Sequence, residues 1–428
     1  MDAISGGILM ERVIFHIDAN SAFLSWSAAY RVRVLGEAQD LREVPSAVAG
    51  DRDSRQGVIL AKSQPAKKYG VQTGEPIFRA LQKCPDLVII PPDYALYVEA
   101  SRHFTALLRE FSPLVEQYSI DEAWADMTGT QGLYGSPVAA AHLLRQRILD
   151  ELGFTVNVGI SSNKLLAKMA GDFEKPNKVH TLYPWEMEEK LWPLPVRDLF
   201  MVGPATERKL HLLGIHTIGE LAHADPQILL KKLHKPGISL WHSANGRYTD
   251  QLLPQPEENK GYGNSTTLPA DLLDAPSAYK VLLALCETVA MRMRQDGKSA
   301  RCLAVSLRSN QFVDFSHQAT LYNATDCTEE IFRHACRIFD EAWDGETPLR
   351  QLGVHATRLE ERGMRQYDLF SVVSGEEYEK KARLDNTIDD LRDKFGEGIL
   401  RRARFVGEKT ILAGGLSKER RTGITKPV

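Results

Sequence analysis

The chain has 428 residues, of which 43% are hydrophobic and 25% are charged, as in globular proteins of about three domains. It contains no apolar run of about 18 residues or more, which excludes a membrane-spanning helix. The formal net charge of −3 by itself disfavours a nucleic-acid partner. The charges are segregated, however, because acids crowd residues 376–393 and lysines gather at 164–178, so we still expect a local basic surface.

The start of the chain and its cysteines indicate where the protein works. Residues 1–9 lack the basic start and apolar core of a signal peptide, and we expect them to be an extension ahead of Met10. The five cysteines are odd in number and include no C-x-x-C pair. We therefore expect neither a zinc site nor a disulfide framework, and a reducing cytoplasm fits this usage.

Residues 10–184 alternate between strand-like and helix-like patterns, which predicts an α/β unit. The expected strands are residues 13–18, 58–61 and 155–160, with a hairpin at 118–126. The expected helices are residues 22–34, 65–69, 94–111, 137–152 and 163–173. Acidic residues stand at the ends of these strands, and they are the first candidates for a functional site.

The first expected strand is an apolar run that ends in Asp18. A buried carboxylate is costly unless it is paired or bound to metal. The hairpin reads Y-S-I-D-E-A-W-A-D and carries the adjacent acids Asp121 and Glu122. Neighbouring side chains of a strand point to opposite faces, so both acids reach one ion only from a hairpin tip or a strand end. A charged β-turn that binds no ion explains this pair equally well.

Together, Asp18, Asp121 and Glu122 predict a site for hard divalent cations such as Mg²⁺, which leave coordination positions for substrate phosphates. Two such ions about 3.5–4 Å apart serve phosphoryl displacement in polymerases and nucleases. Lys175 would supply a further charge for a triphosphate, because Pro176 disfavours helix there and presents the lysine from a loop. A solvated helix end is the alternative reading of Lys175.

Three more side chains near these acids have two readings each. Phe23 follows Asp18 at the start of the first helix, where a ring can exclude a 2′-hydroxyl or can simply be a core aromatic. Lys164 and Lys168 stand four residues apart on one helix face. That spacing fits contact with the DNA backbone or an ordinary solvated face.

A short helical unit is expected at residues 185–253. Residues 200–215 read F-M-V-G-P-A-T-E-R-K-L-H-L-L-G-I, which predicts two helices around a glycine-containing turn. In a helix–hairpin–helix, backbone N–H groups of such a turn bind a DNA phosphate, and a plain αα-hairpin is the alternative. Met201 stands where such hairpins usually have a first glycine. The residues expected to contact DNA are Val202, Gly203, Ala205 and Thr206.

After a polar linker at 254–262, residues 263–363 predict the order β-α-β-β-α-β. This duplicated unit forms a four-stranded sheet with two helices on one face, and its bare face is free to lie along a partner. The expected strands are residues 263–268, 301–309, 312–321 and 351–359, and the helices are 277–295 and 328–343. A polar tail at 364–428 follows, with one amphipathic helix at 376–395.

The tail begins with Gln366-Tyr367-Asp368-Leu369-Phe370. Adjacent Leu and Phe outside a core predict an anchor for a pocket on a partner protein. The alternative is a short strand that docks on the chain itself.

With these segments the chain resembles the Y-family translesion DNA polymerases over nearly its whole length. Three segments carry the resemblance: H-I-D-A-N-S-A-F, Y-S-I-D-E-A-W and A-K-M-A-G-D-F-E-K-P-N. The second is close to the family signature Y-S-I-D-E-A-Y. The resemblance implies an α/β multidomain, right-hand polymerase fold. Palm and fingers would be residues 10–184, a small helical thumb with the helix–hairpin–helix 185–253, and the β-α-β-β-α-β little-finger domain 263–363.

The resemblance also implies roles for individual residues. Asp18, Asp121 and Glu122 become the catalytic, metal-binding acids, joined by the backbone carbonyl of Ala19. Phe23 becomes the steric gate against ribonucleotides. The residues expected to bind the nucleotide are Asn20, Ser21, Ala22, Phe23, Gln64, Lys67 and Lys175, and those expected to bind a sliding clamp are Gln366, Leu369 and Phe370.

Several positions depart from the family pattern. Where the family commonly has Asn-Tyr-x-Ala-Arg in the fingers, this chain has S-Q-P-A-K, so Gln64 replaces the tyrosine and Lys67 the arginine. Loss of the planar guanidinium fork is expected to weaken or shift triphosphate binding. Asn20 and Ala22 stand where relatives often have an acid and an aromatic, and 58 residues follow the clamp-like peptide.

The sequence thus predicts a monomeric, template-directed DNA polymerase for low-fidelity synthesis past damage. It would use two Mg²⁺ ions, primer–template DNA, deoxynucleoside triphosphates and a sliding clamp. One rival is a non-catalytic relative that acts as an adaptor on DNA, but such relatives typically lose the metal acids. A metal-dependent nuclease is the second rival, and it leaves Phe23, the K-P-N lysine and the duplicated unit unexplained together.

Overall fold

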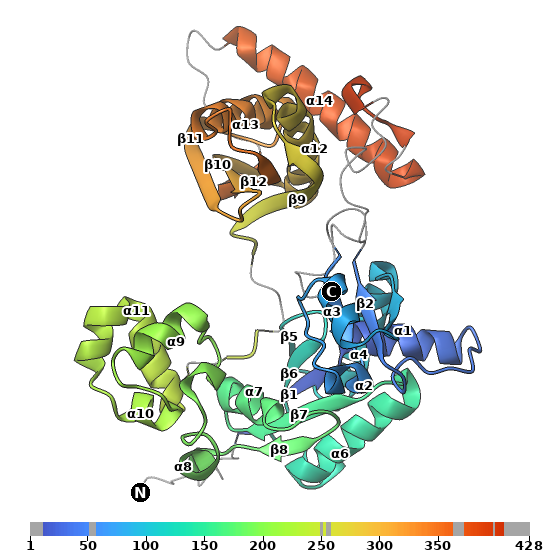
Figure 1. Cartoon of the computed structure of the whole chain (residues 1–428), viewed down its shortest axis with the longest axis vertical. Coiled ribbons are helices and arrows are strands. Elements are labelled where there is room, and N and C mark those ends of the chain that lie inside the picture. The colour runs from blue at the N-terminus through green and yellow to red at the C-terminus, as the bar shows by residue number, and fades with distance from the viewer. Residues whose placement is uncertain are drawn as a thin grey trace, which may run out of the picture. The chain divides into compact units, whose positions relative to one another are not determined.

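The computed structural model describes residues 12–50, 57–248, 251–253, 258–362, 372–396 and 399–405 (Figure 1). The expected extension at 1–9 and the peptide at 366–370 lie outside these residues. The main division of the chain into two compact units falls between residues 257 and 258, inside the expected linker, whereas residue 184 falls within the first unit. No helix of the described residues is both long and apolar enough to cross a lipid bilayer.

A five-stranded sheet in the order β5-β6-β1-β7-β8 lies at the centre of the first unit. Its strands are β1 (Ile14–Ala19), β5 (Val115–Gln117), β6 (Glu122–Asp126), β7 (Val156–Ser161) and β8 (Val179–Thr181). β1 pairs antiparallel with both β6 and β7, and all of its residues are buried. A strand that is covered on both faces reads as a continuous apolar run, which explains the absence of alternation in this segment.

Helices cover both faces of this sheet. On one face, Phe15 and Ile17 of β1 belong to a core shared with α1 (Ala22–Arg33), α4 (Tyr94–Phe111) and α6 (Pro137–Arg147). On the other face, α7 (Lys164–Asp172) packs against β1 and β7. His16 and Asp18 alternate with the core residues, so they lie on the α7 face.

The approach of α7 to β7 depends on glycine. A Cβ atom at Gly159 would lie 2.0 Å from the carbonyl oxygen of Ala167 and 2.4 Å from the nitrogen of Gly171. Any side chain at Gly159 would therefore push α7 away from the sheet. The close packing lets the side chains of α7 reach the polar residues at the end of β1.

A second, three-stranded sheet in the order β3-β2-β4 lies beside the start of α1. It consists of β2 (Ser46–Ala49), β3 (Ile59–Lys62) and β4 (Val88–Ile90), with the short helices α2 (Gln64–Lys68) and α3 (Ile77–Lys83). α2 begins at this point because the Ser63 hydroxyl accepts a hydrogen bond from the Ala66 backbone N–H at 3.1 Å. The sequence analysis missed β2, β4, β5 and β8, which are too short to show a period.

The helical region of the first unit contains η3 (Val196–Asp198), α9 (Pro204–His211), α10 (Ile218–His223) and α11 (Pro226–Ala244). Its core includes Leu199, Leu210 and Ile218, which pack against residues of α7. The turn before α9 forms as expected, and Met201 in this turn has a φ of 73°, the left-handed conformation that glycine favours.

The second unit confirms the expected β-α-β-β-α-β order. Its four antiparallel strands lie in the order β11-β10-β12-β9, and α12 and α13 cover one face (Figure 1). The elements are β9 (Gly261–Leu272), α12 (Ala275–Gln295), β10 (Lys298–Ser309), β11 (Asp314–Thr325), α13 (Thr328–Ala342) and β12 (Leu349–Glu361). Every strand is longer than its pattern predicted, because pairing continues into polar residues at the strand ends.

The expected tail helix is α14 (Val372–Phe395), and it packs on the second unit through charges. Arg294 of α12 donates to both carboxylate oxygens of Asp389 at 2.6 and 3.0 Å and to Asp385 at 3.3 Å. Arg402 donates at 2.6 Å to Glu287, a buried carboxylate of α12. This stretch is therefore part of the packed unit, although its sequence reads as a polar tail.

Candidate active site

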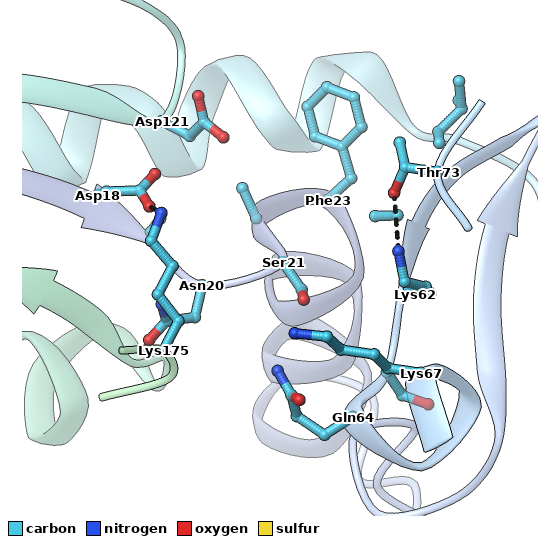
Figure 2. A pocket seen from close by; sticks show the side chains of 15 residues that line it. Asp18, Asn20, Ser21, Phe23, Lys62, Gln64, Lys67, Thr73, Asp121 and Lys175 are labelled. Atoms are coloured by element: carbon cyan, nitrogen blue, oxygen red, sulfur yellow. Dashed lines mark hydrogen bonds and ion pairs between the residues drawn. The ribbon is translucent and has the colours of Figure 1, made fainter. Parts of the chain in front are cut away.

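A cavity of about 350 Å³ lies between the end of β1, the start of α1 and the segment that joins β3 to α2 (Figure 2). The residues that line it are Asp18, Ala19, Asn20, Ser21, Ala22, Phe23, Leu60, Ala61, Lys62, Ser63, Gln64, Lys67, Thr73, Asp121 and Lys175. Except for Glu122, the cavity gathers every residue that the sequence analysis assigned to catalysis, metal or nucleotide. All the lining residues together come from five separate segments of the chain.

Asp18 and Asp121 are brought together by strand pairing. The backbone N–H of Ala19 donates to the carbonyl of Asp121 at 3.0 Å, and Asp18 is the register partner of Glu122. The turn between β5 and β6 therefore lies beside the end of β1. Figure 2 shows both carboxylates at the same end of the cavity.

Both aspartates are held in surroundings that penalise their charge. Burial raises the pKa of Asp18, which is 7% exposed, although the neighbouring Lys175 ammonium lowers it in part. Burial also raises the pKa of Asp121, against a 2.7 Å hydrogen bond from the Ser119 hydroxyl. Two desolvated carboxylates at one place are stabilised by any cation that binds between them.

Glu122 is turned toward the α7 face. Its Oε2 atom accepts from Lys168 Nζ at 2.7 Å and lies 3.3 Å from His16 Nε2. Burial raises the pKa of Glu122, but the hydrogen bond from His16 and the charge of Lys168 outweigh it and lower the pKa to about 2. Glu122 is thus a carboxylate at every physiological pH. Within the described parts of the chain, no three His, Cys, Asp or Glu side chains stand together as a ready metal site.

Lys175 supplies the positive charge at the aspartate end of the cavity. Its ammonium contacts Asp18 and lies 2.9 Å from Asp172. Burial lowers the pKa of Lys175, but the charges of these two aspartates raise it further, so the lysine remains an ammonium. The loop that carries it is fixed by Asn20, whose side chain donates to Asn157 at 3.1 Å and accepts from the Asn177 N–H at 2.9 Å.

Asn20 lines the cavity and also has a structural role that the sequence analysis did not assign. Its side chain is 7% exposed and both of its polar atoms hydrogen-bond within the protein, so it holds the Lys175 loop against β7. Ser21, in the left-handed conformation at φ 49°, turns the chain from β1 into α1.

Phe23 forms the wall between the aspartate end and the β3 end of the cavity (Figure 2). Its ring stacks on Tyr97, with centroids 4.4 Å apart and an interplanar angle of 6°. The Tyr97 hydroxyl lies 3.0 Å from that of Ser27. Phe23 is therefore a cavity wall that also packs against the core, and its exclusion of a 2′-hydroxyl stays a prediction.

The β3 end of the cavity is cationic. Lys67 and Gln64 line it from α2, as the sequence predicted, and Lys62 lines it from β3, which the sequence analysis missed. Lys62 donates to the Thr73 hydroxyl at 3.3 Å. Burial and the nearby charge of Lys67 lower its pKa. Alternation along β3 could have predicted the position of Lys62, because side chains two residues apart in a strand share a face and both Leu60 and Lys62 line the cavity.

The two readings of Lys164 and Lys168, contact with the DNA backbone or an ordinary solvated face, both require exposure, and both are wrong. Each is 8% exposed and forms a buried ion pair, Lys164 with Glu116 and Lys168 with Glu122, both at 2.7 Å. The i, i+4 spacing identified one helix face correctly but not its burial. The close packing at Gly159 turns that face toward the sheet.

The helix–hairpin–helix residues are well placed for backbone contacts. Gly203 is the N-cap of α9, and Val202, Ala205 and Thr206 flank it. The Gly203 side of this turn makes no close approach to other atoms, since a Cβ there would meet nothing within 4 Å. The N–H of Val202 donates to the Leu199 carbonyl at 3.0 Å, and contact of this turn with a DNA phosphate stays a prediction.

Comparison with known proteins agrees with this architecture. Family profiles match the impB/mucB/samB family at residues 17–172, the IMS family HHH motif at 186–215 and the impB/mucB/samB family C-terminal domain at 259–369. The solved Y-family DNA polymerase chimera Dbh-Dpo4(243-245)-Dbh superposes with a TM-score of 0.69 and 22% identity, over 82% of this chain and all of that one. At this identity the superposition establishes the fold.

Curated relatives extend the likeness to nearly the whole chain. The DNA polymerase IV of Clostridium acetobutylicum is 44% identical over 395 residues, covering 92% of this chain and 98% of the relative. That of Moorella thermoacetica is 39% identical over 402 residues, covering 93% and 97%. The fold, the site and these relatives define a DNA-directed DNA polymerase. The chain belongs to the Y family of translesion DNA polymerases, the impB/mucB/samB family.

Proposed function

We propose that this polymerase joins deoxynucleotides to a primer in the cavity of Figure 2, with Asp18 and Asp121 as its central acids. The observation that supports this most directly is the pair of desolvated carboxylates, which lie at one end of a cavity whose other end carries Lys62 and Lys67. The negative phosphates of a nucleoside triphosphate would be attracted by the lysines at one end of the cavity. A cation bound by the acids at the other end would also attract them, so both ends of the cavity fit the same substrate.

The residues at the acid end fit divalent metal. Asp18 and Asp121 offer hard oxygen ligands, and the Ala19 carbonyl directly follows Asp18 in sequence. The raised pKa values show that Lys175 beside Asp18 and the Ser119 hydroxyl beside Asp121 do not fully offset the cost of burying these carboxylates. Glu122 contacts His16 and Lys168 through Oε2, and we assign its other oxygen, Oε1, to a cation. Two Mg²⁺ ions bound there would activate the primer 3′-hydroxyl and stabilise the pyrophosphate leaving group.

The remaining cavity residues position the nucleotide. Lys175 and Lys67 act as point charges for phosphate oxygens, without the bidentate geometry of arginine. Phe23, backed by Tyr97, occupies the wall beside the acids and excludes a ribose 2′-hydroxyl by its bulk. Gln64 adds a neutral amide at the start of α2.

DNA is held by the backbone turn before α9 and by the second unit, through phosphates and without reading sequence. We propose that Gln366, Leu369 and Phe370 bind the sliding clamp. We further propose a monomer in the cytoplasm, which the five free cysteines support because a reducing compartment keeps thiols unpaired.

Single-nucleotide primer extension tests the assignment of the acids. Asp121→Asn and Glu122→Gln should each abolish Mg²⁺-dependent incorporation, because each removes a ligand charge, while DNA affinity stays within a few-fold. If either variant extends the primer near the wild-type rate, the residue replaced in that variant is not a metal ligand. Degradation of the primer by the wild-type protein would instead favour the nuclease alternative.

A further inference from the structure

Glu122 is held from behind by a lysine that the proposed chemistry does not use. Lys168 donates to Glu122 Oε2 at 2.7 Å and is 8% exposed. His16, which is 1% exposed, lies 3.3 Å from the same oxygen. Two donors on one oxygen fix the orientation of a carboxylate more firmly than a single contact does.

The Lys168 ammonium is confined by two aromatic rings. It lies 5.7 Å from the ring centroid of Tyr118 and 5.2 Å from that of Phe200. These rings meet edge to face, with centroids 6.2 Å apart. Tyr118 begins the turn that carries Asp121, so the rings close the space around the ammonium and direct it at Glu122.

We propose that Lys168 is a positioning residue for catalysis, which holds Glu122 by Oε2 so that Oε1 is presented toward the metal end of the cavity. This inference rests on the proposed function, because it takes Glu122 as a metal ligand. Residues that orient a ligand in this way commonly change metal affinity or activity by about 10- to 100-fold when they are replaced.

A purely structural role is the competing reading, and the same helix supplies a matched reference for it. Lys164 stands one turn before Lys168, is equally buried at 8% exposed, and donates at 2.7 Å to Glu116. Its ammonium also lies over a ring, 4.6 Å from the centroid of Trp124. Neither Glu116 nor Glu122 lines the cavity, but Glu122 directly follows Asp121, which does, whereas Glu116 lies in β5. Burial, ion pairing and ring contact are thus shared, and only the carboxylate partner differs.

The experiment compares Lys168→Met with Lys164→Met in the full-length protein. Binding of Mn²⁺ alone is measured by electron paramagnetic resonance, and kcat and KM by single-nucleotide insertion. Lys168→Met should weaken Mn²⁺ binding and lower kcat by about tenfold each, with KM for the nucleotide little changed. Lys164→Met should leave Mn²⁺ affinity and kcat near the wild-type values, even where it lowers stability by a similar amount.

The sign of the Mn²⁺ result separates orientation from charge. Removing a positive charge near the metal would by itself tighten Mn²⁺ binding, so weaker binding in Lys168→Met reports lost orientation. Unchanged or tighter binding would overturn the proposal. Phe200→Leu serves if Lys168→Met does not fold, because it opens the ring enclosure without changing any charge. It should weaken Mn²⁺ binding several-fold, and unchanged binding would count against the proposal.

Glu122→Gln distinguishes this failure from failure of the proposed function. If Glu122→Gln binds Mn²⁺ as the wild type does, Glu122 is not a ligand and the assignment of the acids is at fault. If Glu122→Gln weakens binding while Lys168→Met behaves like Lys164→Met, only the positioning role is wrong.

Discussion

Phe23 stacks face to face on Tyr97, with ring centroids 4.4 Å apart and planes inclined by 6°. Phe23 lies in the first turn of α1 and lines the cavity, whereas Tyr97 lies in α4 and is fully buried. The hydroxyl of Tyr97 is held at 3.0 Å by Ser27, so the ring that supports Phe23 is itself fixed. A wall built in this way is rigid enough to discriminate between sugars that differ by one hydroxyl.

Phe23→Val should admit ribonucleotides, because the smaller side chain leaves room for a 2′-hydroxyl. The ratio of kcat/KM for a ribonucleotide to that for its deoxynucleotide should rise by about 10- to 200-fold, the range for discrimination by bulk in a pocket. Steady-state insertion opposite one template base measures it. Tyr97→Phe keeps the stacking ring but loses the hydroxyl contact with Ser27, so the ratio should change much less than in Phe23→Val. An unchanged ratio in Phe23→Val would reduce Phe23 to a core residue.

Lys67→Ala should raise KM for the incoming nucleotide by about tenfold with a smaller effect on kcat, since a lost phosphate contact costs roughly 1.4 kcal/mol. The matched control is Lys68→Ala, because Lys68 is exposed on the same short helix and does not line the cavity. Each variant replaces one lysine of α2 with alanine, so both lose one positive charge from the same helix. Equal effects on KM would show that general electrostatics, and not a contact in the cavity, attracts the nucleotide.

Met201→Gly should stabilise the protein relative to Met201→Ala by about 1 kcal/mol, because alanine retains the cost of a left-handed residue at φ 73°. Met201 is 69% exposed, so loss of its side chain costs little burial. Urea unfolding of both variants measures the difference. Equal stability would mean that the turn relaxes when the methionine is removed. Any gain in DNA affinity of the glycine variant would further indicate that this turn contacts DNA.

Tyr262 gives a pH-dependent contribution to the stability of the second unit. Burial and the 2.5 Å hydrogen bond to Asp296 raise its pKa to about 12. Since the folded pKa lies above the unfolded value, the contribution is full below about pH 10 and is lost as the pH rises toward 12. Tyr262→Phe should therefore lower the free energy of unfolding at pH 8 by about 1–3 kcal/mol, and by less at pH 11.

Urea unfolding at the two pH values tests the Tyr262 prediction. Tyr322→Phe is the control, since Tyr322 is 67% exposed in the same unit and should change stability little at either pH. A Tyr262→Phe effect that stays constant from pH 8 to pH 11 would rule out ionisation of Tyr262 as its source.

Replacing Leu369 and Phe370 together with alanine should abolish binding to a bacterial sliding clamp and the stimulation of synthesis by it. Basal primer extension without the clamp should persist, because none of the residues assigned to catalysis, metal or nucleotide belongs to the peptide. Surface plasmon resonance on immobilised clamp measures the first effect. If the double variant instead loses thermal stability and basal activity together, the peptide packs on the chain itself.

The local pattern was enough to predict most of the fold. Helix α4 and the duplicated order of the second unit follow from periodicity, which depends only on residues near in sequence. The placement of acids at the end of β1 and before β6 follows likewise, because a carboxylate inside an apolar run has few other positions. The three- and four-residue strands β2, β4, β5 and β8 could not be found this way, since they form only when a neighbour supplies the hydrogen bonds.

Tertiary structure decided which polar side chains face the cavity and which are buried behind it. Spacing placed Lys164 and Lys168 on one helix face, but their partners Glu116 and Glu122 lie more than 40 residues away, and only packing reveals them. The same holds for Asn20, whose burial depends on the Lys175 loop. Sequence periodicity determines faces, whereas burial depends on what packs against each face. The sequence therefore predicted most of the residues that line the cavity, whereas the contacts that support them came only from the fold.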